Sequence, residues 1–271
     1  MTTSSMPLLI AEPNLSTAWA RAFLHILDHP GKEVSPLVIA IDGFHDGVPL
    51  EDEPVRRMLD AALLAVGEQE VHTVANTIFP TSVWRLSQGD RQRFYATYIK
   101  SIDRYKALAK TKNNRGLYFE RLIAFGTDGT PRDGNQLEYI IEAYLARPGV
   151  RRSMFQLAIF DPARDHVGTA QMGFPCLHSI SFVPGDGGLA LNAFYPTQQV
   201  FEKAYGNLLG LARLGGFVAG QMGLEFRRLN CFVGIEKLDE QPKSSPALTD
   251  LIAACRVLIS QEALAVGAAT A

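Results

Sequence analysis

An apolar stretch in the C-terminal half, residues 197–222, constrains the fold of this chain more than any other feature, because it predicts one long helix. Its five glycines cost about 1 kcal/mol each in helix propensity relative to alanine. Close packing against a neighbouring backbone is the usual compensation, so the helix is expected to be buried. The stretch also carries Arg213 and Gln221, which argue against a membrane span. The glycines are Gly206, Gly210, Gly215, Gly216 and Gly220.

A buried helix needs a sheet or other helices to cover it, and the rest of the chain supplies both. Apolar or alternating runs predict strands, and three- and four-residue periodicity predicts helices. The order of these segments predicts an α+β domain, or a mixed α/β one, with no linker dividing residues 1–271. The expected strands are 36–42, 153–160, 177–183, 189–194 and 228–238, and the other expected helices are 17–28, 54–66, 88–110, 135–146 and 246–263.

Charge and cysteine content exclude several classes of function. The net charge is -2 with a pI of about 6.3, which does not suit binding to a nucleic-acid polymer. Three cysteines with no CxxC pair argue against a disulfide framework or a zinc site. Residues 1–6 lack the pattern of a signal peptide, so we expect a cytoplasmic protein without a membrane or metal partner.

The Pro175-Cys176 pair follows a turn and opens an expected strand, a place where a thiol is held rigidly at the mouth of a cavity. A small buried hydrophobic role is the alternative for such a cysteine. A Cys-His hydrolase is a further alternative, with His45, His72 or His166 as the base, although none of them lies in a partner motif.

Four segments, in order and spacing, resemble thymidylate synthase. Residues 173–178 are similar to the Pro-Cys-His stretch that holds the nucleophile of that family. Residues 135–152 resemble its helix followed by paired arginines, here Arg151 and Arg152. Asn207 follows Cys176 by 31 residues (207 − 176), where the family keeps its pyrimidine-reading Asn, and Tyr118 resembles its active-site Tyr. The resemblance covers roughly residues 116–239.

The resemblance implies a thymidylate synthase-like fold, with a mixed sheet, a long buried helix and a homodimer packed sheet to sheet. It implies that Cys176 adds to C6 of a uracil-type ring, with Tyr118 as a second catalytic residue. Asn207 would read the O4 and N3–H edge of the base, since its amide both donates and accepts. Arg151 and Arg152 would bind a 5'-phosphate in the site of the other subunit. Methylenetetrahydrofolate is the implied one-carbon donor.

Several positions depart from the family pattern. Leu177 replaces the His that follows the cysteine, and His178 is expected on the opposite strand face. Thr197 retains a hydroxyl in the phosphate-binding turn, where Pro196 replaces a cation. The folate-facing Asp at the start of the long helix is replaced by Gln199.

The sugar-binding His and Tyr are replaced by Lys237 and Asp239. We therefore expect Thr197, Gln199 and Lys237 to contact an altered substrate. The sequence predicts a divergent enzyme that methylates or hydroxymethylates C5 of a uracil-type nucleotide. A non-catalytic nucleotide-binding or sensing protein with the same fold is the alternative, because fold alone does not carry function.

Overall fold

A computed structural model of the chain describes residues 6–108, 113, 116–126, 134–147, 149–166, 168, 176–185, 187–238 and 241–269. Its centre is a seven-stranded mixed sheet in the order β1-β3-β9-β8-β7-β6, with β2 paired to β9 beside this path. The β1–β3 and β8–β9 pairs are parallel, and the others are antiparallel. The strands are β1 (Leu8–Glu12), β2 (Glu33–Val34), β3 (Leu37–Ile41), β6 (Gln156–Ala158), β7 (Ser179–Gly185), β8 (Gly188–Gln199) and β9 (Phe226–Lys237).

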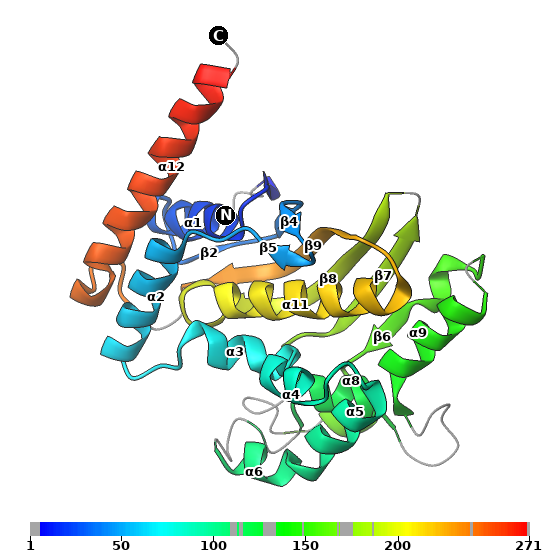
Figure 1. The fold of residues 1–271 in the computed structure, drawn as a ribbon. Coiled ribbons are helices and arrows are strands. Elements are labelled where there is room, and N and C mark those ends of the chain that lie inside the picture. The colour runs from blue at the N-terminus through cyan, green and yellow to red at the C-terminus, as the bar shows by residue number, and fades with distance from the viewer. Residues whose placement is uncertain are drawn as a thin grey trace.

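Helices cover one face of this sheet, which is its inner face, and leave the outer face open. On the inner face α11 (Tyr205–Met222) runs across β9, β8 and β7 (Figure 1). The predicted α+β class with a mixed sheet and a long buried helix is thus confirmed at this level. The other helices are α1 (Leu15–Asp28), α2 (Glu53–Ala65), α3 (Val71–Ile78), α4 (Thr81–Leu86), α5 (Arg91–Lys100), α6 (Ile102–Ala107), α8 (Tyr118–Ile123), α9 (Gln136–Ala146), α10 (Pro162–Asp165) and α12 (Thr249–Ala269). Two short strands, β4 (Phe44–His45) and β5 (Val48–Pro49), form a separate hairpin.

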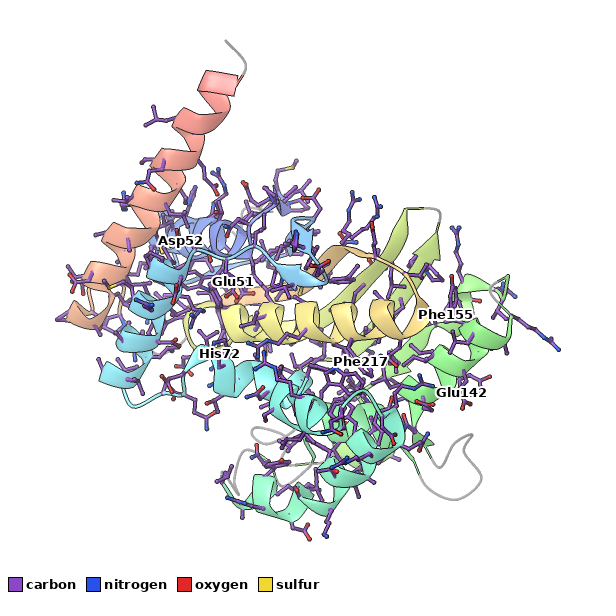
Figure 2. All side chains as sticks on the ribbon, in the orientation of Figure 1. Glu51, Asp52, His72, Glu142, Phe155 and Phe217 are labelled. Atoms are coloured by element: carbon purple, nitrogen blue, oxygen red, sulfur yellow. The ribbon has the colours of Figure 1, made fainter. Side chains whose placement is uncertain are left out.

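The glycines of α11 let its backbone approach α3, as their number predicted. A methyl group at Gly206 would lie 2.6 Å from Cβ of Val74, and one at Gly210 would lie 2.8 Å from the carbonyl oxygen of Ala75. Farther along, Phe217 leaves α11 toward α4 and packs against Trp84, with ring centroids 4.8 Å apart (Figure 2). Close backbone packing against α3 therefore holds one side of α11, and aromatic packing of Phe217 holds its C-terminal part.

Two predicted helices have different boundaries. The helix expected from residue 197 begins only at Tyr205, because β8 continues to Gln199 in register with β9 and a π-helical turn, Val200–Ala204, follows it. Thr197 and Gln199 therefore lie on a strand and not at a helix start. The helix expected over residues 88–110 divides at Ser101 into α5 and α6. Residues 109–110, at the end of that prediction, lie outside the described part of the chain.

No helix among the described residues has both the length and the hydropathy that a membrane crossing requires.

Candidate functional site

Cys176 lies just ahead of β7, and its side chain is exposed. The amide of His178 donates to the carbonyl of Phe194 at 2.9 Å, and Ser179 pairs with Phe194 in the antiparallel ladder. Cys176 therefore lies beyond the Ser179–Phe194 pair, toward the Gln199 end of β8. The residues 173–175 of the expected motif lie outside the described residues, as does Asp239.

Tyr118 is brought to Cys176, as the sequence predicted. The Cys176 amide donates a hydrogen bond to the Tyr118 hydroxyl at 3.2 Å. Burial raises the pKa of Tyr118, and the charge of Cys176 raises it further. The hydroxyl is therefore neutral at physiological pH. It lies beside the backbone of Cys176, just ahead of β7.

An ion pair fixes the helix that carries Tyr118. Arg121 of α8 donates to both carboxylate oxygens of Asp165 at 2.5 and 2.8 Å, and to the carbonyl oxygen of Ile159 at 2.7 Å. Both charged side chains are fully buried.

The inner face beside Cys176 contains polar residues that sequence reasoning missed. Tyr195 and Gln198 of β8 and Glu236 of β9 are all buried. Burial raises the pKa of Glu236 well above its ordinary value. Burial also raises the pKa of Tyr195, and the charges of Tyr118, Cys231, Cys176 and Glu236 add to the effect. The Tyr195 hydroxyl has no hydrogen-bond partner among the described residues.

A shift in strand alternation creates this arrangement. Alternate residues of β8 are buried as far as Tyr195, and then Gln198 is the next buried position. In β9 the same step separates Val233 from Glu236. Tyr195 pairs with Val233 and Gln198 pairs with Glu236, so the shift occurs in the same rows of both strands. A plain alternating pattern would have turned Gln198 and Glu236 to the outer face.

The remaining predicted residues lie in three places. Gln199 and Lys237 pair in the last row of β8 and β9, half-buried and close to the Cys176 end. Asn207 is 3% exposed within α11. Arg151 and Arg152 are exposed and lie at the opposite end of β7, where the Arg152 guanidinium comes near Gly185. Nine residues of extended strand separate that end from Cys176, which is about 30 Å.

His178 lies on the outer face of the sheet, opposite to Leu177, as its position in the strand predicted. Its ring stacks on Phe160 with centroids 5.3 Å apart and meets the edge of Phe194 at 5.4 Å. Leu177 is fully buried. His178 therefore takes part in aromatic packing.

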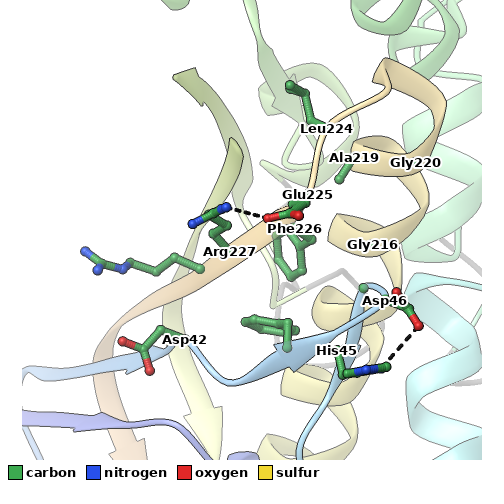
Figure 3. Close-up of a pocket in the computed structure, with 13 residues that line it drawn as sticks. Asp42, His45, Asp46, Gly216, Ala219, Gly220, Leu224, Glu225, Phe226 and Arg227 are labelled. Carbon is green, nitrogen blue, oxygen red and sulfur yellow. Dashed lines mark hydrogen bonds and ion pairs between the residues drawn. The ribbon is translucent and has the colours of Figure 1, made fainter. Parts of the chain in front are cut away.

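A pocket of about 680 Å³ lies at the other end of β9, beside the β4–β5 hairpin (Figure 3). Its lining includes an ion pair between Arg227 and Glu225, and His45 Nδ1 lies 3.2 Å from Asp46. Of the residues considered from the sequence, His45, a candidate base for the hydrolase alternative, lines it, whereas Cys176, Tyr118 and Asn207 do not. Phe226 of the pocket pairs with Leu189, whereas the Cys176 end of β8 is at Thr197, so the pocket and the thiol are separated by most of the strand.

No group of three or more His, Cys, Asp or Glu residues within the described ranges is placed to hold a metal ion. No protein-family model matches the chain, and no curated protein matches it in sequence.

Proposed function

We propose that the protein is a divergent one-carbon transferase that acts at C5 of a uracil-type pyrimidine nucleotide. The Cys176 thiolate forms a bond to C6, and the electron pair of the C5–C6 double bond moves to O4 as an enolate. C5 then attacks an electrophilic one-carbon unit. Loss of the C5 proton and departure of the carrier with the electron pair of its bond to the one-carbon unit leave an exocyclic methylene group on C5. Water adds to this group in hydroxymethylation, or a hydride from the donor adds in methylation. The double bond then returns to C5–C6 as the S–C6 bond breaks and releases the thiolate.

The observation that carries this proposal is the hydrogen bond between the backbone of an exposed cysteine and a half-buried tyrosine from a distant segment. Cys176 and Tyr118 are 58 residues apart, yet the Cys176 amide donates to the Tyr118 hydroxyl. A nucleophile needs access to its substrate and a fixed position, and the two residues provide both. Asn207 would read the base, with Thr197, Gln199 and Lys237 as further substrate contacts.

The arginine pair supports a homodimer as the active form. Arg151 and Arg152 lie far from Cys176 of their own chain, so they can serve a phosphate there only from a second subunit. The outer sheet face offers a surface for that subunit, since Phe232 and Ile235 are 42% and 39% exposed. Exposed apolar residues on an uncovered sheet face are typical of an interface. We propose that two copies pack through this face.

A folate that carries a methylene group is the donor that the family resemblance implies. The position expected to hold an acid for the folate ring is Gln199, whose amide is neutral and pairs in register with Lys237. These residues do not fit the expected folate contact. The proposed mechanism therefore names its donor only as an electrophilic one-carbon unit.

Intact mass spectrometry tests the nucleophile. The protein is incubated with 5-fluorouracil ribo- and deoxyribonucleotides, with and without methylenetetrahydrofolate, and Cys176→Ala is the control. We expect a mass increase that requires Cys176, because fluorine blocks the release of C5. Nucleotide binding without an adduct, unchanged in Cys176→Ala, would instead support a non-catalytic nucleotide-binding protein.

Subunit mixing tests the dimer. Cys176→Ala and the double variant Arg151→Ala, Arg152→Ala should each fail to form the adduct. In a randomised equal mixture, half of the dimers are mixed and each contains one intact site, so about a quarter of the sites should react. No adduct in the mixture would contradict the shared site.

A further inference from the structure

Two neighbouring side chains on the inner face of the sheet have no hydrogen-bond partner among the described residues. Both polar side-chain atoms of Gln198 and both carboxyl oxygens of Glu236 are unpaired, although the two residues are only 3% and 0% exposed. A buried polar group without a partner destabilises the folded protein and is rare in native structures, and a bound ion is one usual reason for it. The pair is therefore a candidate ion-binding site.

The spacing of the two side chains follows from the register of the strands. Gln198 of β8 pairs with Glu236 of β9, and the shift that both strands share turns both side chains inward. Neighbouring strands lie about 4.8 Å apart, and Gln and Glu side chains have the same length. Two such side chains that extend side by side end about 4.8 Å apart, which is too far for a hydrogen bond. This spacing agrees with the lack of a bond between them.

A small cation fits between two side chains with this spacing. An ion midway between them lies about 2.4 Å from an oxygen of each, and proteins hold calcium, whose radius is close to that of sodium, at about 2.3–2.6 Å from oxygen. Carboxylate and carbonyl oxygens are the ligands that such hard cations prefer. The unpaired atoms are closed to water, which is larger than a bare sodium ion. Size and ligand type therefore both favour an ion like sodium.

The charges around the pair select a monovalent ion. Glu236 is the one acid of the site, so a sodium ion neutralises it, whereas calcium would leave an excess positive charge in the interior. The titratable groups that face Glu236 are Tyr195 and Cys231, and Val34 of β2 pairs with it on the other side. None of these three side chains carries a positive charge. The Tyr195 hydroxyl is also buried and unpaired, and it supplies one more oxygen close to the site.

We propose that Gln198 and Glu236 bind one sodium ion between their side chains, at the ends of β8 and β9. In a sodium-free solution Glu236 keeps its proton, because burial raises the pKa of its carboxyl group. The ion replaces this proton, which leaves to solvent, and is coordinated by the Glu236 carboxylate and the Gln198 carbonyl oxygen. It thereby links the strand ends that carry Gln199 and Lys237. The site contains a single acid, which distinguishes it from a group of three or more His, Cys, Asp or Glu residues.

Thermal unfolding in sodium chloride and in tetramethylammonium chloride of equal ionic strength tests the site. The measurement is made at mildly alkaline pH, where the proton competes least with the ion. Above the dissociation constant, each tenfold rise in sodium should raise the Tm of the natural protein by about 2–3 °C. Tetramethylammonium is too large for the site and should not produce this rise.

Three variants assign the sodium effect to the proposed pair. Glu236→Gln keeps the length of the side chain but removes its charge, and should abolish the sodium-specific rise in Tm. Gln198→Met removes the amide oxygen and should shift the rise to higher sodium concentrations. Glu225→Gln removes an acid that is 75% exposed just before β9, and should leave the rise unchanged. The sodium NMR signal should be broadened by the natural protein and remain sharp with Glu236→Gln.

Equal Tm values in the two salts would overturn the inference, as would the same sodium-specific rise in the natural protein and Glu236→Gln. A sodium signal that stays sharp with the natural protein would also overturn it. If Glu236→Gln does not fold, the comparison of Gln198→Met with the natural protein decides. The test uses no nucleotide, so absence of a nucleotide adduct would refute the proposed function and leave the sodium measurement unaffected.

Discussion

The ion pair between Arg121 and Asp165 offers the sharpest test of how the site is held together. Asp165→Asn keeps the size of the side chain but removes its charge, so the Arg121 guanidinium remains buried without a counter-charge. Both side chains are fully buried and joined by two hydrogen bonds. Breaking such a pair from one side costs about 3–5 kcal/mol. We expect a loss of this size in the free energy of unfolding.

Urea unfolding at pH 7 measures this loss. A matched control is Glu53→Gln, which breaks the exposed pair of Glu53 with Arg57 and should cost only about 0.3–0.5 kcal/mol. Replacing both Arg121 and Asp165 by Met and Leu should recover most of the stability, because no buried charge remains. A loss below about 1 kcal/mol for Asp165→Asn would refute the reasoning.

The same pair gives a pH dependence of defined sign. Burial alone would raise the pKa of Asp165, but the hydrogen bonds from Arg121 outweigh burial and the pKa is lowered. The contribution of Asp165 to stability is therefore complete above its unfolded pKa of 3.8 and is lost as pH falls through the folded pKa. Asp165→Asn should remove this acid-dependent part of the unfolding curve.

Three further predictions concern other parts of the molecule. Gly206→Ala should lower the free energy of unfolding in urea by about 1–3 kcal/mol, because the added methyl group meets Val74. Gly220→Ala, with open space around it, should raise that free energy by about 1 kcal/mol. Equal effects of the two substitutions would contradict the packing argument. Burial raises the folded pKa of Glu236 above its unfolded value of 4.5, so the contribution of Glu236 to the free energy of unfolding falls by about 1.4 kcal/mol per pH unit between these two pKa values. Thermal unfolding of Glu236→Gln should lack this decline. Parallel curves of stability against pH for the natural protein and Glu236→Gln would contradict the buried, neutral state of Glu236. A thiol reagent added to the folded protein should label Cys176 quickly and the two buried cysteines only on unfolding, and rapid labelling of all three would contradict the fold.

Much of the fold was predictable from local signals. The cap of α1 at Asn14 and the strand at residues 37–41 follow from side-chain chemistry that acts within a few residues. The glycines of α11 correctly indicated close backbone contact. The boundary at Gln199 was not predictable in this way, because pairing with β9, more than 30 residues away, holds residues 197–199 in a strand.

The candidate site was predictable only in part. Spacing and resemblance selected Cys176 and Tyr118, which the structure brings together. Gln198 and Glu236 gave no signal, since Gln198 fell within the expected helix 197–222 and plain alternation in the expected strand 228–238 turns Glu236 to the outer face. Only the coincidence of two shifts in neighbouring strands turns them inward. The burial of Arg121 was not predictable for a similar reason, because its partner Asp165 lies in a distant segment.

The paired shift in β8 and β9 also limits how this protein can evolve. Deleting one residue near Pro196 would restore regular alternation in β8 and leave the shift in β9 in place. The last residues of β8 would then face the wrong side of the sheet relative to their partners in β9. Gly234 makes this coupling tight, because a methyl group there would lie 2.7 Å from the Pro196 carbonyl oxygen. Relatives of this chain should therefore gain or lose residues in the two strands together, so a length change at one position predicts a length change about 40 residues away.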